Sequence, residues 1–470
     1  MVLVKINLAG GSSQQYSLPF NAERSVNLYP IVDPRGSDNA SLYNTPGLSL
    51  FGTYGTGAIR GCYAASTGRA FVVSGSILYE IFADGSSTNR GSLASSSGIV
   101  TVADNGVQLG ICDGQKAYMF TYATNVLVQV TDPDFPSSVG AIGYIDSYFM
   151  VNENNTGKWY ISALLNGLSW DALDFATAES SPDKLNRAFN FLGYVGLFGD
   201  RTLELWRNTG DSAFPFAKVS SSTPIGCEAP YTITSVDTSV YWVGANEQGS
   251  GIVYQAQGFT PKRISTEPIE KLLQAVLDPT QLRGWAYQEQ GHVFYAITGS
   301  DLETTLVYDL NTQLWHERAW RNEQGEFEQH RAACVMRVFD KLLVGDRENG
   351  KVYEMSLDYY DDAGDPKHWV RILTHLIDEL NYIRYNSLQI GFEMGVGLQS
   401  GQGSAPRVNL RVSSDGARTW SNYYSKSIGA VGKYKNQVRW RRLGISQINT
   451  FELSGSEPVK TVITGAYLNK

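Results

Sequence analysis

The fold is decided by stretches such as AFVVSGSILYEI, residues 70–81, in which two short apolar runs are joined by Ser74, Gly75 and Ser76. Apolar runs that are linked by a few Gly, Ser, Asn or Asp residues predict a β-hairpin. The second run has the pattern apolar, apolar, Tyr, any residue, apolar, with Tyr79 at its centre. The same hairpin pattern returns along most of the chain.

The tyrosine pattern recurs at regular intervals. A seventh copy, TLELW, has Glu204 in the tyrosine position, and the steps between the seven anchor positions are 39, 42, 44, 50, 54 and 45 residues. A further apolar run precedes most hairpins and a weaker one follows. Four antiparallel strands in about 40 to 50 residues correspond to one β-propeller blade. The six tyrosine anchors are Tyr79, Tyr118, Tyr160, Tyr254, Tyr308 and Tyr353.

Most of the strand-like runs are apolar throughout and do not alternate between apolar and polar residues. Strands that are buried on both faces have this character, as strands between two neighbouring blades do. The sequence therefore predicts an all-β protein whose main part is a β-propeller of seven repeat modules. Six or seven blades are compatible with the repeat, because the Glu204 copy could form an irregular module. An irregular all-β sandwich is the alternative.

The repeat divides the chain into three predicted parts. Residues 1–50 lack the repeat and form an extended N-terminal arm, which could complete the C-terminal domain. Residues 51–376 hold the β-propeller. Residues 377–470 contain alternating strands that predict a separate β-sandwich-like domain.

One helix is predicted within the propeller, in STEPIEKLLQAVL, residues 265–277. Ser265 or Thr266 can cap its first turn, and Pro268 suits that turn. An apolar stripe predicts that the helix packs against the ring. The stripe consists of Ile269, Leu272, Leu273, Val276 and Leu277.

Composition limits the classes of function. The net charge of −8 means that the surface as a whole does not attract nucleic acid, although it suits a channel through which DNA slides without sticking. The four cysteines lie far apart without a CxxC pair, which predicts buried thiols in a reducing compartment. No apolar run reaches the roughly 18 residues of a membrane span, and the N-terminus does not resemble a signal peptide. We expect a soluble protein without membrane insertion.

The motifs that resemble catalytic sites fail in detail. Residues 345–351 spell GxxxxGK, but Val352 follows where a phosphate-binding loop needs Ser or Thr, so a hairpin turn is expected. SSDGARTW, residues 413–420, resembles the Asp-box of sialidases, but Gly416 is one place early and the motif occurs once. We therefore expect no enzyme activity, no metal and no cofactor. A glycan-binding or sialidase-like β-propeller is the alternative, because 27 Tyr and 10 Trp could stack on sugars.

One basic segment differs from the acidic average of the chain. On a β-strand, its first four cations would share one face. Arginine forks suit phosphates and carboxylates, so the segment is a candidate contact for DNA or for a partner protein. A solvated outer strand face is the alternative. The cations are Lys433, Lys435, Arg439, Arg441 and Arg442, interleaved with Tyr434 and Trp440.

Several stretches together resemble a known family, the packaged-DNA stabilisation proteins of short-tailed bacteriophages, which are tail accessory factors that form the hub or nozzle of the tail. The resemblance spans nearly the whole chain in the same order. It is carried by RSVNLYP at 24–30, NTPGL at 44–48, RGCYAASTGRAFVVSGSILYEI at 60–81, FLGYVGLFGDRTLELW at 191–206 and SSDGARTWS at 413–421.

This resemblance implies a structural protein of the virion tail that is assembled in the host cytoplasm. It implies a homo-oligomer, a hexamer, attached below the adaptor ring that extends the portal. In that place the protein would retain packaged double-stranded DNA, and its lumen would form the exit channel for genome ejection. The implied partners are the head-to-tail adaptor, the tail needle or tip, and tailspikes or tail fibres. No catalytic residue is implied.

Overall fold

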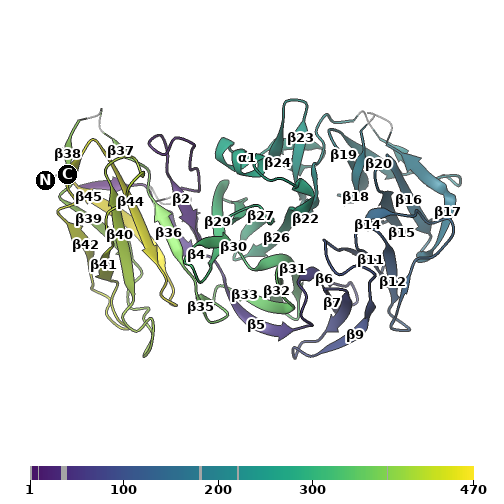
Figure 1. Cartoon of the computed structure of the whole chain (residues 1–470), viewed down its shortest axis with the longest axis horizontal. Helices are drawn as coiled ribbons and strands as arrows, with labels where there is room; N and C mark the ends of the chain where they lie inside the picture. The colour runs from purple at the N-terminus through teal and green to yellow at the C-terminus, as the bar shows by residue number, and fades with distance from the viewer. Residues whose placement is uncertain are drawn as a thin grey trace.

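The computed structural model describes residues 3–8, 10–32, 40–178, 183–219, 222–377, 379 and 381–470. Over these residues the chain consists of β-sheets with one α-helix and one short 3-10 helix. Figure 1 shows a ring of sheets and, beside it, a second layered unit in which both ends of the chain lie.

Six blades of the ring are each formed by four antiparallel strands that follow one another along the chain. The first two blades are β6 (Ile59–Ala64), β7 (Ala70–Ser74), β8 (Ile77–Ile81) and β9 (Ser87–Ser92), then β10 (Thr101–Asp104), β11 (Gln108–Cys112), β12 (Ala117–Thr121) and β13 (Val126–Gln129). The next two are β14 (Val139–Ile145), β15 (Tyr148–Glu153), β16 (Lys158–Ala163) and β17 (Asn166–Thr177), then β18 (Leu185–Phe191), β19 (Tyr194–Gly199), β20 (Leu203–Asn208) and β21 (Phe216–Lys218). Blades five and six are β22 (Ala229–Val236), β23 (Ser239–Asn246), β24 (Gly249–Gln257) and β25 (Thr260–Arg263), then β26 (Arg283–Glu289), β27 (His292–Thr298), β28 (Thr305–Asp309) and β29 (Leu314–Arg321).

The seventh blade takes its outer strand from the N-terminal part of the chain. Its first three strands are β31 (Ala332–Val338), β32 (Lys341–Asp346) and β33 (Lys351–Ser356), and its fourth is β5 (Gly47–Thr53), which pairs antiparallel with β33. Because one sheet joins the first and last parts of the propeller, the ring is closed by hydrogen bonds. Strand β5 runs across residue 50, where we predicted the boundary between the N-terminal arm and the propeller. That boundary remains a prediction.

All seven anchors lie in the third strand of a blade, so the repeat predicted the ring correctly. The Glu204 copy is a regular blade as well, and the number of blades is seven. The Glu204 carboxylate is buried, accepts a hydrogen bond from Trp206 Nε1 at 3.1 Å and lies 3.4 Å from Lys218 Nζ. These partners compensate the charge that stands in the tyrosine position.

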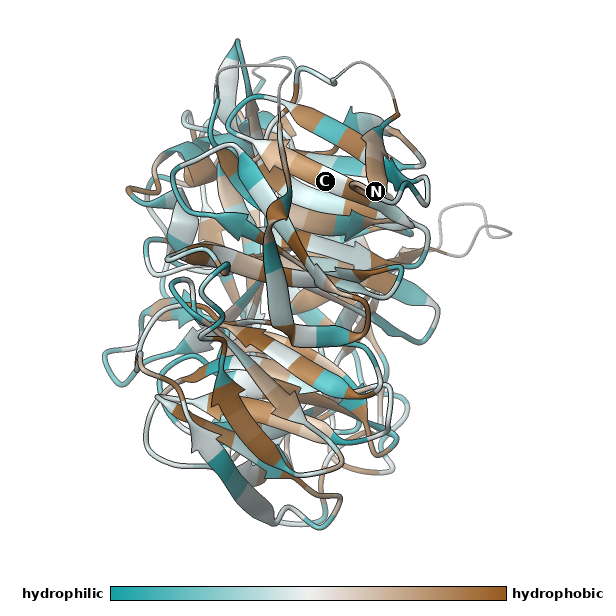
Figure 2. Cartoon of the chain, turned by 90° about the vertical axis from the view of Figure 1, so that its right-hand side faces the viewer, coloured by the Kyte–Doolittle hydropathy of each residue, from teal (hydrophilic) through white to brown (hydrophobic). Residues whose placement is uncertain are grey.

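Neighbouring blades pack face to face, as the runs of apolar residues predict. All five residues of β7 and of β11 are buried. Phe71 of the first blade meets Phe120 of the second with ring centroids 5.2 Å apart, within one buried cluster. Figure 2 shows the strands of adjacent sheets as largely hydrophobic and the loops that join them as mainly hydrophilic.

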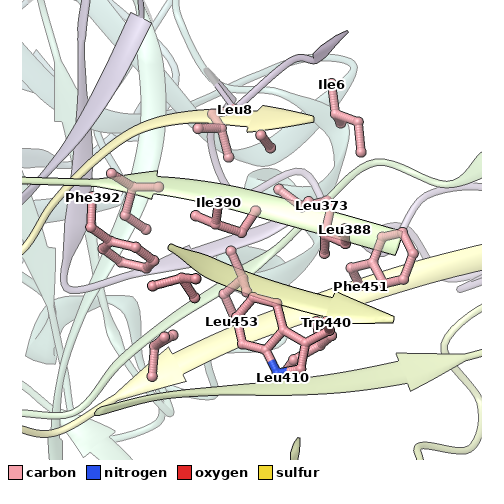
Figure 3. Close-up of a cluster of buried hydrophobic side chains, with 14 of the residues drawn as sticks. Ile6, Leu8, Leu373, Leu388, Ile390, Phe392, Leu410, Trp440, Phe451 and Leu453 are labelled. Carbon is pink, nitrogen blue, oxygen red and sulfur yellow. The ribbon is translucent and has the colours of Figure 1, made fainter. Parts of the chain in front are cut away.

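The unit beside the ring is a β-sandwich of two sheets. One sheet contains β1 (Leu3–Ile6), β3 (Leu28–Val32), β4 (Ala40–Asn44), β45 (Val462–Asn469), β39 (Ser387–Phe392) and β42 (Val438–Arg441). The other contains β2 (Arg24–Val26), β36 (Trp369–Ile372), β44 (Ile448–Gly455), β40 (Arg407–Ser413) and β41 (Tyr424–Ser427). Figure 3 shows side chains from both sheets meeting in one apolar core, among them Leu388, Ile390, Leu410 and Leu453.

The RSVNLYP segment joins the sandwich to the ring. Strand β2 pairs antiparallel with β36 of the sandwich and parallel with β29 of blade six, through Val26 and Glu317. Directly after β2, the buried Asn27 adopts φ +55°. Its Nδ2 donates to the carbonyl oxygens of Ala319 in the ring at 2.8 Å and of His368 at 2.7 Å, and its Oδ1 accepts from Ala319 N at 3.1 Å.

An ion pair reinforces the same junction. Arg24 of β2 donates from Nε and Nη2 to the Glu317 carboxylate of β29 at 2.9 and 2.6 Å. The Glu317 side chain also accepts from Thr304 at 2.9 Å. We call Arg24, Asn27 and Glu317 the clasp, because each bonds across the boundary between sandwich and ring.

The predicted helix is present as α1 (Glu267–Gln274), between blades five and six. Ile269 and Leu273 are buried against the ring, as predicted, but Leu272 is 48% exposed and Leu277 is 91% exposed. Those two positions were predicted wrongly, because the helix ends at Gln274 and its buried face is narrower than the apolar stripe. Ser265 Oγ donates to Glu270 at 2.6 Å, and neither Ser265 nor Thr266 caps the helix with its side chain.

Candidate interaction sites

The ring axis holds a cavity of about 340 Å³. Its lining comes from the first strands of every blade except the third and includes Arg60, Arg187 and Arg283. Side chains connect non-adjacent blades at the axis, because Tyr231 Oη of blade five lies 3.1 Å from Gly140 O of blade three and Arg283 Nη1 of blade six lies 3.4 Å from Arg60 O of blade one. The axis of this propeller is therefore not a passage for duplex DNA.

All four cysteines are free thiols, and the prediction that they are buried holds for two of them. Cys112 and Cys227 are buried, and burial raises the pKa of the Cys112 thiol to about 12, so this thiol stays protonated. Cys62 and Cys334 are half-buried and lie together in the lining of the axial cavity.

The basic segment does not form one continuous strand. Strand β42 covers only Val438–Arg441, and Lys433 and Lys435 lie in the turn before it. The prediction that Lys433, Lys435, Arg439 and Arg441 share one strand face was therefore wrong for the two lysines. The turn is held by a hydrogen bond from Asn436 Nδ2 to Ser427 O at 2.7 Å.

The arginines of this segment line a groove of about 1010 Å³ at one side of the sandwich. The groove lies between β41 and β42, the terminal strands of the two sheets. Terminal strands carry unpaired backbone groups and are places where another chain can add a strand. All four residues of β41 are exposed.

The cations of this groove are available to a ligand. Arg439 donates to Ser387 Oγ at 2.8 Å, while Arg441, Arg442 and Lys426 are exposed and form no ion pair within the described residues. Two exposed aromatic side chains, Tyr423 and Tyr424, line the same groove. Lys433 and Lys435 line a separate, smaller pocket with Tyr434. The three arginines thus lie together in the groove, and the two lysines lie in the turn that joins β41 to β42.

The Asp-box-like turn has a local structural role. Asp415 accepts hydrogen bonds from Thr419 Oγ1 at 2.6 Å, from Thr419 N at 3.0 Å and from Ser413 Oγ at 2.7 Å. Its hydrogen bonds with Thr419 and Ser413 hold the pKa of Asp415 far below its usual range. The carboxylate is occupied by its own turn, so the motif gives no support to a glycan site.

The stretch that resembles a phosphate-binding loop, residues 345–351, is also a turn. In the loop between β32 and β33, Asn349 Oδ1 accepts from Lys351 N at 2.9 Å, so the GxxxxGK stretch is a hairpin connection and not a phosphate-binding loop. The parts of the chain that the structure describes contain no group of three or more His, Cys, Asp or Glu side chains placed to hold a metal ion.

Two family models match successive parts of the chain. One, described as bacteriophage P22 Gp10, beta-propeller, matches residues 4–360, and the other, described as bacteriophage P22 Gp10, beta-sandwich, matches residues 368–469. The chain belongs to the bacteriophage P22 Gp10 family. This family comprises packaged-DNA stabilisation proteins, and the chain is accordingly a structural protein of a phage tail. The resemblance that the sequence motifs indicated is confirmed.

Solved structures add no functional argument. The chain is similar to virginiamycin B lyase from Staphylococcus aureus, with 12% identity and a TM-score of 0.43 over 64% of this chain and 94% of that one. It is also similar to the Neurospora crassa Pan2 WD40 domain, with 8% identity and a TM-score of 0.39 over 65% and 95%. No curated protein matches the chain. The described residues include no helix with the length and apolar character to cross a membrane.

Sequence reasoning missed the arginines on the ring axis. Arg60, Arg187 and Arg283 each lie within the first three residues of the first strand of a blade. An arginine near the start of the first strand in three different blades was a signal in the sequence. It could be read only once the blade register, and with it the inner strand, was known.

Proposed function

We propose that the chain is a hub or nozzle subunit of a short-tailed phage tail, attached below the portal–adaptor ring. There it retains packaged DNA and lines the channel through which the genome leaves. The observation that carries the proposal is the match of Gp10 family models to both the propeller and the sandwich. Assembly in the host cytoplasm as a hexamer is part of the proposal.

The size of the axial cavity supports a channel that is formed between copies of the chain. Because duplex DNA does not fit through one propeller, a DNA channel requires several propellers around a common axis. In that arrangement each seven-bladed ring is a rigid wall element. The net charge of −8 on every copy would repel phosphates and keep DNA from adhering to the wall.

The basic side of the sandwich is the proposed contact for DNA or for an acidic partner. Its five cations are exposed or half-buried and lie beside two open sheet edges, a combination that suits an extended acidic segment as well as a phosphate backbone. Within the proposed tail, the candidate partners are the adaptor ring, the needle or tip, and a tailspike or fibre. The residues are Lys433, Lys435, Arg439, Arg441 and Arg442.

Electron microscopy of the purified chain mixed with portal–adaptor complex tests the proposal. We expect a ring of six copies on the narrow end of the adaptor, with density along its axis wide enough for duplex DNA. Monomers that stay unattached under assembly conditions would contradict the hub assignment. A glycan array and a fluorogenic sialoside assay test the alternative of a glycan-directed propeller, for which binding or cleavage would be required.

A charge-reversal pair tests the basic side separately. We expect Arg441→Glu with Arg442→Glu to weaken adaptor attachment or DNA binding, while Arg207→Glu, an exposed arginine on β20 of the ring, has no effect. If DNA is the ligand, the slope of log K against log salt should become shallower by about 0.9 for each phosphate that the variant no longer neutralises. Unchanged attachment and unchanged DNA binding would leave these cations as a solvated face.

A further inference from the structure

Two of the three arginines on the ring axis lack an anionic partner. Arg187 of β18 and Arg283 of β26 line the cavity of about 340 Å³, and no Asp or Glu belongs to its lining. Within the described residues neither arginine forms an ion pair with a carboxylate. A cation inside a protein is costly unless a counter-charge or hydrogen bonds compensate it.

The hydrogen bonds of these two arginines are incomplete. Arg187 Nη1 donates to Pro230 O at 2.7 Å, but its Nε is buried without a partner. Arg283 Nη1 reaches the carbonyl oxygens of Ile59 and Arg60 only at 3.5 and 3.4 Å, the outer limit of a hydrogen bond. A guanidinium group has five N–H donors, so both side chains keep donors for a ligand.

Arg60 lines the same axial cavity, but its hydrogen bonds are complete. Its guanidinium makes five hydrogen bonds of 2.5 to 2.9 Å with Gly75 in the turn between β7 and β8 and with residues 95–98 in the loop between β9 and β10. Ser95 Oγ accepts one of them and donates to Asp113 at 2.6 Å, which brings a carboxylate next to the cation. All five N–H donors of Arg60 are therefore engaged by the fold, whereas Arg187 and Arg283 keep donors for a ligand.

Tyr231 lines the axial cavity of about 340 Å³ together with the two arginines that have incomplete hydrogen bonds. Its Oη donates to Gly140 O at 3.1 Å. Tyr231 and Ile99 also line a second cavity of about 600 Å³, whose lining is polar and comes mainly from loops, so the two cavities share a wall.

We propose that the ring axis binds a small oxyanion, a carboxylate or a phosphate group, between Arg187 and Arg283. A planar guanidinium fork matches both groups in two hydrogen bonds, and the cavity has the volume of a small-ligand pocket. The bound anion neutralises two cations that the fold leaves unpaired. Because Arg187, Tyr231 and Arg283 belong to blades four, five and six, the anion ties three blades together at their inner strands. This site does not depend on the proposed role in the tail.

Titration calorimetry of the full chain tests the proposal with two probes, inorganic phosphate and acetate, in chloride buffer of constant ionic strength. We expect one of the two anions to bind with a stoichiometry of one per chain. Arg187→Gln and Arg283→Gln should each weaken its affinity about 10-fold or more, the usual effect of losing a charge-assisted hydrogen bond. Arg207→Gln, at an exposed arginine on β20 of the ring, is the matched control and should leave the affinity unchanged.

Arg283→Lys distinguishes the effect of the two-pronged guanidinium geometry from the effect of the positive charge. It keeps the cation and should retain weaker binding than the natural chain, while Arg283→Gln loses it. Tryptophan fluorescence and thermal unfolding of each variant without anion show whether the ring is intact. Stronger binding of phosphate or of acetate identifies the group that the site takes. If neither anion binds the natural chain, or if an intact Arg283→Gln chain binds as well as the natural one, the proposal is wrong.

Discussion

Replacing Asn27 with Ala is expected to destabilise the chain by about 4 kcal/mol. The buried Asn27 side chain makes three hydrogen bonds across the junction, two to Ala319 and one to His368, at 2.7 to 3.1 Å. Each contributes about 1 kcal/mol, and the peptide groups of Ala319 and His368 would be left without these partners. The φ of +55° adds about 1 kcal/mol, because Ala tolerates the left-handed region less well than Asn.

Asn155→Ala is the matched control for the backbone contribution. Asn155 has nearly the same φ, +61°, but its side chain is exposed and makes no hydrogen bond within the described residues. An unfolding entropy of about 2.1 cal/mol/K per residue gives about 1 kcal/mol/K for 470 residues. We therefore expect a fall in Tm of about 4 °C for Asn27→Ala and about 1 °C for Asn155→Ala, measured by calorimetry.

The comparison of these two variants decides whether the junction depends on Asn27. If both variants lose the same 1 °C, the hydrogen bonds of Asn27 contribute nothing and the clasp does not hold the sandwich to the ring. A separate low-temperature transition in Asn27→Ala, with the main transition unchanged, would locate the damage in the sandwich alone. Either result would refute the reasoning that one residue couples the two units.

Two further predictions concern ring closure and pH. Leu48→Ala should lower the free energy of unfolding in urea by about 2–5 kcal/mol, because the Leu48 side chain on β5 is buried in the core. Leu50→Ala on the same strand should change it by less than about 0.5 kcal/mol, because Leu50 is 53% exposed. Equal effects of the two variants would mean that β5 does not close the ring. Burial raises the pKa of Glu317, but the charge and hydrogen bonds of Arg24 outweigh it, so the folded-state pKa lies below the ordinary 4.5. The Arg24–Glu317 pair therefore stabilises the fold fully above about pH 4.5, and this stability is lost as the pH falls through the lower folded-state pKa. Glu317→Gln should flatten the dependence of Tm on pH in that range, and an unchanged acid dependence would contradict the assignment.

The repeat predicted the blades because its signal is local. Each anchor, from Tyr79 to Tyr353, lies in the third strand of its blade, where both faces are buried against neighbours. The Glu204 copy left the blade count open in the sequence. Its compensation comes from Trp206 and Lys218, and only the pairing of β20 with β21 brings Lys218 to the carboxylate.

The basic segment shows where local reasoning fails. The two-residue period of a β-strand predicted that Lys433, Lys435, Arg439 and Arg441 share one face. That prediction assumes an extended backbone over the whole segment. The chain turns before Val438, and the positive φ of Gly432, +77°, is part of that turn. Charge alone identified the residues, and the position of the turn decided their arrangement.

The sequence by itself determined the repeat of seven modules and the all-β class, because these depend on the order and spacing of apolar and turn residues, and its motifs resembled those of a phage tail family. Three features depended on the tertiary structure: the closure of blade seven by β5, the clasp at Asn27, and the position of Arg187 and Arg283 in one axial cavity. Each joins residues that lie roughly 100 to 300 positions apart, and no local pattern records such a pairing. They arise only when the ring closes and the first and last parts of the chain come together.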